Sequence, residues 1–95
     1  MNPLADAVVA VVEELGDAHV LSLATAYRSL GSYTPASATA VRQAVPAGHR
    51  DHVDPLNRAW AAIPENSGPA VALALETALA AKRSGAVARD LRDGG

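Results

Sequence analysis

The densest group of polar side chains in the sequence begins at His49 and ends at Asp54. The imidazoles of His49 and His52 and the carboxylate of Asp54 suit zinc and other borderline divalent ions, so these three residues are candidate metal ligands. Pro46 precedes the group and Pro55 follows it, a setting that favours a loop whose last residue, Asp54, caps the next helix. We expect a solvated helix-entry loop, with binding of a divalent metal or small ligand as the alternative.

No other group of residues forms a recognised catalytic arrangement. The sequence contains no Gly-x-Ser-x-Gly elbow, phosphate-binding glycine loop, dinucleotide-binding fingerprint or His-Glu-x-x-His motif. The absence of cysteine excludes a cysteine nucleophile, a thiolate zinc site and a disulfide framework. His19 has only Asp17 as a neighbour of catalytic type, and we expect it to be structural. The sequence therefore predicts no enzymatic activity and no cofactor.

Aromatic residues make up only 3% of the chain, so each one is a candidate anchor. Trp60 lies near Ile63 in a predicted helix, where packing in the core is favoured over a role as an interface anchor. Tyr33 falls in a turn after Gly31 and is the better candidate for an exposed aromatic. Trp60 and Tyr33 are both retained as candidate interaction residues.

Charge alone does not identify a partner, since 8 basic and 10 acidic residues give a net charge of -2. This balance predicts no nucleic-acid binding by the chain alone. Glu13 and Glu14, at the end of a predicted helix, oppose the helix dipole and indicate a basic surface nearby, in this chain or in another. A small basic group near the C-terminus is a candidate site for a phosphate or an acidic helix; its members are Lys82, Arg83, Arg89 and Arg92.

A chain of 95 residues has the size of a single domain. Alanine, leucine and valine dominate its apolar residues, a composition that favours helices. The longest apolar runs, Ala7–Val12 and Ala70–Leu75, are far shorter than the ~18 residues that span a bilayer. The first predicted helix also lacks the basic start and long apolar stretch of a signal peptide. We expect a cytoplasmic protein that does not bind membranes.

Capping signals predict five helix starts. Asn2 and Thr34 each precede a proline, which is typical of an N-cap followed by proline at the first helical position. Asp17, Asp54 and Ser67 are the predicted caps of the other helices. No segment shows the period-two alternation of a strand, so we predict an all-α fold without strands.

Glycine and proline predict where the helices end. Gly16, Gly31 and Gly85 are predicted stops, and prolines end the other two helices. The predicted helices span about 3–15, 18–30, 35–45, 55–63 and 69–85. The chain is thus expected to form one compact bundle of about five short helices over residues 1–85, followed by a charged, flexible tail at 86–95.

Three segments carry a family resemblance: Leu15–Val20, Ala59–Pro64 and Ser67–Leu75. Through them, the chain from Leu15 to Arg83 resembles the helical N-terminal region that precedes the phospholipase-D-like domain in one component of DISARM anti-phage systems. The catalytic signature of that family, His-x-Lys followed by an aspartate, is absent, because no histidine here has a lysine two residues later. The resemblance implies an accessory region, without the active site, of a bacterial defence protein.

These observations support one leading hypothesis and two alternatives. The leading hypothesis is a non-catalytic helical module that interacts with another protein or domain. The first alternative is binding of a small ligand or divalent metal at His49, His52 and Asp54. The second is a self-associating, death-fold-like adaptor, an analogy based on size and helix number that keeps a homo-oligomer among the options.

Overall fold

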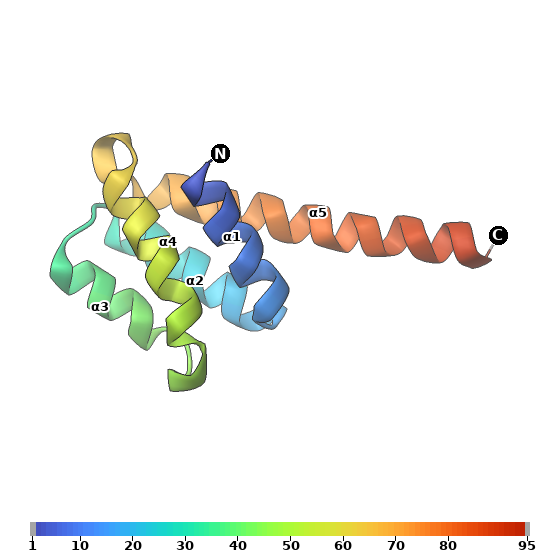
Figure 1. Ribbon diagram of the computed structural model, residues 1–95, viewed down its shortest axis with the longest axis horizontal. Helices are drawn as coiled ribbons and strands as arrows, with labels where there is room; N and C mark the ends of the chain where they lie inside the picture. The colour runs from blue at the N-terminus through green and yellow to red at the C-terminus, as the bar shows by residue number, and fades with distance from the viewer. Residues whose placement is uncertain (1, 95) are drawn as a thin grey trace.

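The computed structural model describes the backbone of residues 2–94 and the side chains of residues 2–85. Five α-helices follow one another along the chain (Figure 1): α1 Pro3–Glu14, α2 Asp17–Leu30, α3 Pro35–Gln43, α4 Arg50–Ala62 and α5 Gly68–Gly94. Short 3-10 turns, η1 Ala47–His49 and η2 Pro64–Asn66, precede α4 and α5. The described residues contain no strand, only an isolated bridge between Ser32 and Ser67, so the predicted all-α bundle is confirmed.

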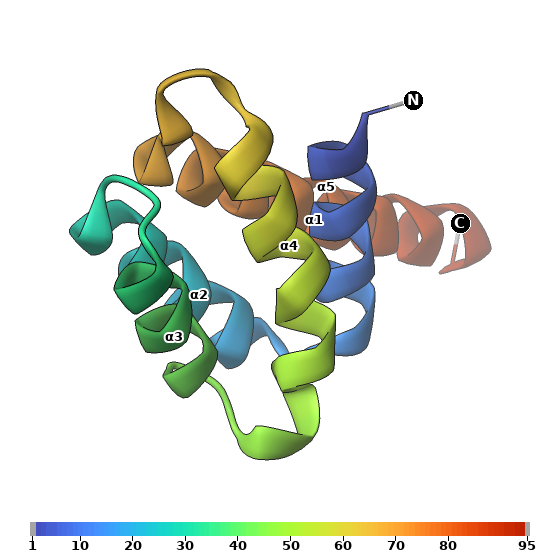
Figure 2. The same ribbon diagram turned by 60° about the vertical axis from the view of Figure 1, so that its left-hand side comes forward.

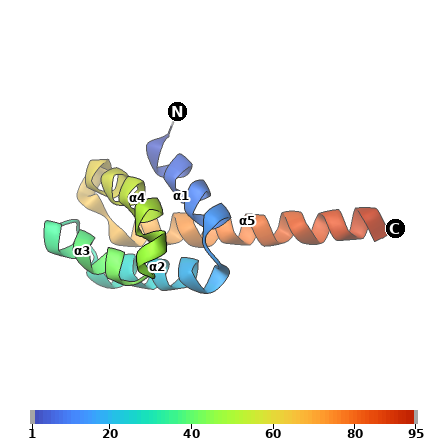
Figure 3. The ribbon, with the colours of Figure 1, turned by 60° about the horizontal axis from the view of Figure 1, so that its bottom comes forward.

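The longest helix, α5, packs against both α1 and α2. α2 runs antiparallel to it, since Gly31 meets Gly68 near one end and Asp17 meets Arg83 near the other. α1 crosses α5 at a steep angle (Figure 3) and also packs against α4 (Figure 2). α3 packs against α2 and α4, on the side away from α5. The core lies where these five helices meet.

The predicted caps of α1 and α3 form as expected. The Oδ1 atom of Asn2 accepts hydrogen bonds from the backbone N–H groups of Leu4 and Ala5, at 3.0 and 3.3 Å. The Oγ1 atom of Thr34 accepts from the N–H of Ser37 at 3.0 Å. Each cap satisfies donors that the first turn of a helix leaves without an intrahelical partner, which fixes where α1 and α3 begin.

The start of α4 differs from the prediction. The sequence pattern indicates a loop with Asp54 as the N-cap, whereas α4 begins at Arg50 and contains Pro55. The turn η1 leads directly into the helix because His49 already has helical backbone angles (φ -108°, ψ -2°). Pro55 has no N–H group, so the carbonyl of Asp51, four residues earlier, receives no hydrogen bond from it. Asp51 lies in an exposed first turn where water can reach this carbonyl, and the helix therefore tolerates the proline.

The junction between α1 and α2 also differs from the prediction. Gly16 is not a left-handed helix stop; it has φ of -65° and occupies the N-cap position predicted for Asp17. α1 ends where Leu15 adopts an extended backbone (φ -100°, ψ 150°) and buries its side chain. Asp17 is instead the first residue of α2, where its carboxylate accepts hydrogen bonds from Arg83 at 3.1 and 3.2 Å.

The last helix continues past its predicted end. Gly85 does not stop α5, which runs to Gly94 and projects from the bundle (Figure 1). Among the described glycines, it is Gly31, with a φ of 75°, that has the positive φ typical of a helix end. No proline follows Gly85, and a glycine inside a helix costs only ~1 kcal/mol relative to alanine. Because of this projection, the radius of gyration, 13.9 Å, is larger than that of a compact bundle of the same length. The flexibility of 86–95 stays a prediction, and the side chains of these residues lie outside the described part of the structure.

Trp60 lies in the middle of the core. Its ring meets those of Tyr27 and Tyr33 edge-on, at centroid distances of 4.9 and 5.4 Å. The indole Nε1 donates to the carbonyl oxygen of Asn66 at 2.7 Å, so the polar atom of this fully buried side chain is satisfied. This is the core role that the sequence favours for Trp60, and it leaves no ring surface to anchor a partner.

A buried hydrogen-bond network joins α2, α3 and α4. The Tyr27 hydroxyl donates to Oδ1 of Asn57 at 2.6 Å, and Nδ2 of Asn57 donates to the carbonyl oxygen of Ala38 at 3.2 Å. Burial raises the pKa of the Tyr27 hydroxyl, and the carboxylate of Asp54 adds to the effect. The hydroxyl therefore stays neutral and donates. Every buried side-chain N or O atom of the described residues has a hydrogen-bond partner.

The start of α5 depends on a glycine. The N–H of Gly68 donates to the carbonyl oxygen of Gly31, and a Cβ at position 68 would overlap the carbonyl oxygens of Tyr27 and Gly31. The Oγ atom of Ser67 accepts from the N–H of Ala70 at 3.2 Å, which confirms Ser67 as a cap. Glycine at 68 lets α5 approach the end of α2 closely enough for the two helices to pack along their length.

Candidate docking groove between α1 and α5

Two large apolar side chains that remain exposed border the same groove. Val9 on α1 is 48% exposed and Leu73 on α5 is 63% exposed. Both line a hollow between these two helices. Leu21, which is 44% exposed, lies on α2 and does not line it. Among the described residues, two of the three exposed large apolar side chains therefore lie together in this groove.

The wider part of the groove has a volume of about 470 Å³ and an almost wholly apolar lining. α1 contributes Ala5, Val8 and Val9. α5 contributes six residues, namely Ala70, Leu73, Ala74, Thr77, Ala78 and Ala81. Alanine makes up most of this lining, and its small side chain allows another element to approach the helix backbones closely.

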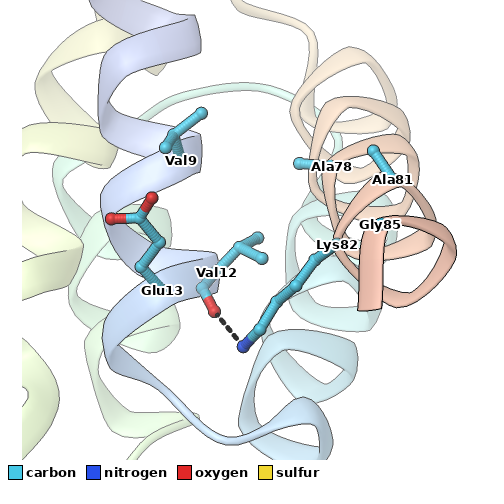
Figure 4. A pocket seen from close by; sticks show the side chains of 7 residues that line it. All are labelled: Val9, Val12, Glu13, Ala78, Ala81, Lys82 and Gly85. Atoms are coloured by element: carbon cyan, nitrogen blue, oxygen red, sulfur yellow. Dashed lines mark hydrogen bonds between the residues drawn. The ribbon is translucent and has the colours of Figure 1, made fainter. Parts of the chain in front are cut away.

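The groove continues toward the C-terminal end of α1 as a second hollow of about 360 Å³ (Figure 4). The two hollows share Val9, Ala78 and Ala81, so they adjoin. The remaining lining residues of this second part are Val12, Glu13, Lys82 and Gly85. The groove thus changes from an apolar channel to a polar end.

Lys82 sets the electrostatics of that polar end. Its side chain reaches from α5 to α1, where Nζ donates to the carbonyl oxygen of Val12 at 3.0 Å (Figure 4). Carbonyls at a helix C-terminus carry partial negative charge, which an ammonium group stabilises. Glu13 and Glu14 led us to expect a basic group near this helix end, and Lys82 of the same chain supplies it. Glu13 itself lines the groove beside Lys82.

Two surface ion pairs join α2 to α5, on the side of α5 that faces away from the groove. Arg28 pairs with Glu76, and Arg83 pairs with Asp17 at 3.1 Å. The hydrogen bond from Arg28 lowers the pKa of the Glu76 carboxyl and raises that of the guanidinium. Both pairs are solvent-exposed, so they contribute little to stability. Their position shows that α2 covers one side of α5 and leaves the side with the groove open.

The three candidate metal ligands, His49, His52 and Asp54, are not grouped around one point. His49 ends η1, whereas His52 and Asp54 lie in the first turns of α4. The Asp54 carboxylate pairs with Nε of Arg42 on α3 at 3.0 Å. Among the residues that the structure describes, no three His, Cys, Asp or Glu side chains are grouped to hold a metal ion.

His49 instead meets a histidine from a distant part of the sequence. The ring of His19, in the first turn of α2, lies 5.3 Å from the ring of His49 between centroids, with a 47° angle between their planes. Both side chains are half-buried. No local sequence pattern signals this contact, because it depends on how η1 packs against α2.

The remaining candidate interaction residues are dispersed. Tyr33 is half-buried against Trp60, and Trp60 is fully buried. Lys82 and Arg83 contact different helices of their own chain, α1 and α2. The side chains of the other two basic candidates, Arg89 and Arg92, lie outside the described residues.

No protein-family profile, curated protein or solved structure matches this chain. The resemblance to the DISARM component therefore rests on the sequence segments alone. Within the part of the chain that the structure describes, none of the helices has the length and apolar character needed to cross a bilayer.

Glu13, Lys82 and Gly85 were singled out from the sequence for other reasons, whereas the apolar residues that line the groove were not. Their signal is nevertheless present in the sequence. Apolar residues that recur at helical spacing form an inward stripe on each helix: Leu4, Val8, Val11, Val12 and Leu15 on α1, and Val71, Leu75, Ala78 and Leu79 on α5. Val9 and Leu73 are apolar but fall outside these stripes. Val8 and Val71 belong to those stripes and are buried. The groove itself forms only where α1 and α5 pack side by side, so neither segment of the sequence indicates it alone.

Proposed function

We propose that this chain is a non-catalytic interaction module that binds one amphipathic helix of a partner protein in the groove between α1 and α5. The observation that carries the proposal is the exposure of Val9 and Leu73 in a single apolar groove. Single exposed apolar side chains are ordinary on a protein surface, whereas a contiguous apolar patch is typical of an interaction site.

The dimensions of the groove favour a helix as the occupant. Its lining on α5 extends from Ala70 to Gly85. At ~1.5 Å per residue, the α5 wall is about 22 Å long, or roughly four helical turns, and the α1 wall, from Ala5 to Glu13, is about 12 Å long, or roughly two turns. A partner helix with apolar residues three and four positions apart can place several of them along such a groove. Both walls of the groove are helices, so neither offers the strand edge that an extended peptide would need.

Covering the exposed side chains supplies part of the affinity. Full burial of a valine or leucine side chain is worth about 1.5–3 kcal/mol, so covering the exposed halves of Val9 and Leu73 contributes about 2 kcal/mol together. The apolar residues of the partner helix supply a comparable amount from their own side. Glu13 and Lys82, at one end, favour the partner orientation that brings opposite charges next to them.

The biological setting is part of the same proposal. The resemblance to the DISARM component supports an accessory role beside a separate catalytic domain in a bacterial, cytoplasmic defence protein. The partner helix would then belong to another domain or to another protein of that system. A self-associating adaptor is the alternative, in which a second copy of this chain occupies the groove.

A photo-crosslinking residue at position 73 tests the proposal in the source cell. Leu21 is the matched control, because it is a comparably exposed apolar residue on α2, outside the groove. We expect position 73 to cross-link an amphipathic helical segment of one partner protein, and position 21 not to cross-link it. A Leu73→Lys substitution should abolish capture of that partner, whereas Leu21→Lys should not.

Three outcomes would contradict the proposal. Equal cross-linking of the same proteins from positions 73 and 21 would show that the groove has no selectivity. A cross-linked peptide from this chain itself would support the self-associating adaptor instead. Substrate turnover by the purified chain would overturn the non-catalytic assignment.

A further inference from the structure

We infer that His19 and His49 form a two-histidine binding site for a borderline divalent cation such as Zn²⁺. His19 lies in the first turn of α2, and His49 ends η1 directly before α4. Their ring centroids are 5.3 Å apart. The site lies outside the α1–α5 groove and does not depend on the proposed function.

The separation of the two rings suits a shared metal ion. A tetrahedral zinc ion about 2.0 Å from one nitrogen of each ring would place the two centroids about 5 Å apart. The observed separation is 5.3 Å.

Water completes the coordination shell in this proposal. Both histidines are half-buried, so each keeps part of its surface open to solvent. The described residues provide no group of three ligands, which limits the protein ligands to this pair. Two imidazoles held together by the fold still bind a metal more tightly than one, because the second bond forms at high effective concentration.

Nearby charges decide whether a dication is tolerated at this position. Each of the two helix N-termini carries about half a positive charge, which opposes a cation. Asp51, in the first turn of α4, carries a full negative charge and forms no ion pair with any described residue. Asp17 adds a second carboxylate, shared with Arg83, while the Arg50 guanidinium donates to the Arg42 carbonyl. Asp17 and Asp51 each lie two residues from one of the histidines, so their negative charges act against those of the two helix ends.

Titration of the full chain with ZnCl₂, followed by calorimetry, tests the inference. The wild-type protein should bind one Zn²⁺ saturably, and His19→Gln or His49→Gln should weaken binding by about tenfold, as expected when a two-point attachment becomes a single one. The matched control is His52→Gln, since His52 is half-buried on the same stretch of chain but outside the pair. Its affinity should remain within about twofold of wild type.

A measurement on the wild-type protein keeps the test valid if a variant fails to fold. Addition of ZnCl₂ should shift the imidazole nitrogen resonances of His19 and His49 together in an NMR spectrum, and leave those of His52 in place. Zn²⁺ should also raise the thermal unfolding midpoint, and a chelator should reverse the rise. The absence of saturable binding, or an equal effect of all three histidine substitutions, would overturn the inference.

Discussion

The ammonium nitrogen of Lys82 lies 3.0 Å from the carbonyl oxygen of Val12 and donates a hydrogen bond to it across the groove. This contact attaches the C-terminal end of α1 to α5 three residues before Gly85, the point where the sequence predicted α5 to end. It also gives one end of the groove a charged group, while the lining of the wider part stays apolar. Lys82 therefore links the stability of the fold to the character of the candidate site.

Replacing Lys82 with methionine tests the stabilising effect of this contact. The Lys82→Met variant keeps the apolar stem and removes the charge, so it should lower the free energy of unfolding by about 0.5–1 kcal/mol. Arg83→Met is the matched control, because it removes only the exposed pair with Asp17 and should cost a few tenths of a kcal/mol. Urea denaturation gives both values. Equal effects of the two substitutions would assign no special role to Lys82.

Gly68 should be the glycine least tolerant of substitution among those described. Gly68→Ala would drive a methyl group into the carbonyl oxygens of Tyr27 and Gly31 and should destabilise the protein by about 1–3 kcal/mol. Gly85→Ala places its methyl group in open space inside α5 and should stabilise the helix by about 0.5–1 kcal/mol. Opposite shifts of the urea midpoint are expected. A neutral Gly68→Ala would contradict the close approach of α5 and α2.

The buried network around Asn57 predicts a large effect from the loss of one hydroxyl group. Tyr27→Phe leaves Oδ1 of Asn57 buried without its donor and should cost about 1–3 kcal/mol. Tyr33→Phe is the control, because the ring of Tyr33 packs on the same tryptophan while its hydroxyl has no hydrogen bond to a described residue. That variant should change stability by less than about 0.5 kcal/mol. Similar losses in both variants would rule out the network as the cause.

Stability should decline in alkaline solution because of Tyr27. Burial raises the pKa of this hydroxyl above 10.0, the value in an unfolded chain, so the unfolded state loses its proton first. The stabilisation that comes from the neutral Tyr27 hydroxyl is fully present below pH 10. As the pH rises above 10, the free energy of unfolding decreases by up to ~1.4 kcal/mol per pH unit. Urea midpoints measured on both sides of pH 10 should fall less in Tyr27→Phe than in wild type. Parallel curves would contradict this linkage.

Leu73 should matter for binding and not for folding. It is 63% exposed, so Leu73→Lys should change the free energy of unfolding by less than about 0.5 kcal/mol. Val71→Lys, two residues earlier, would bury a charge at a fully buried position and should prevent a cooperative fold. Thermal unfolding followed by circular dichroism distinguishes the two. A strongly destabilised Leu73→Lys variant would place Leu73 in the core and remove it from the docking surface.

The helix starts with side-chain caps were predictable because their signals are local. Asn2, Thr34 and Ser67 each place an oxygen within reach of donors two or three residues away, whatever the rest of the chain does. Asp17 and Asp54 carry the same signal, but the fold uses them for pairs with Arg83 and Arg42. In both cases the helix begins before the residue that would follow the predicted cap, at Asp17 itself for α2 and at Arg50 for α4.

The sequence by itself determined the all-α class and the inward apolar stripes of the helices, because periodicity and capping act over a few residues of one chain segment. It also placed Trp60 in the core as the favoured alternative. Only the tertiary structure decided that Val9 and Leu73 share a groove and that His19 meets His49. These relationships depend on the packing of helices that are distant in sequence, which no short-range pattern encodes.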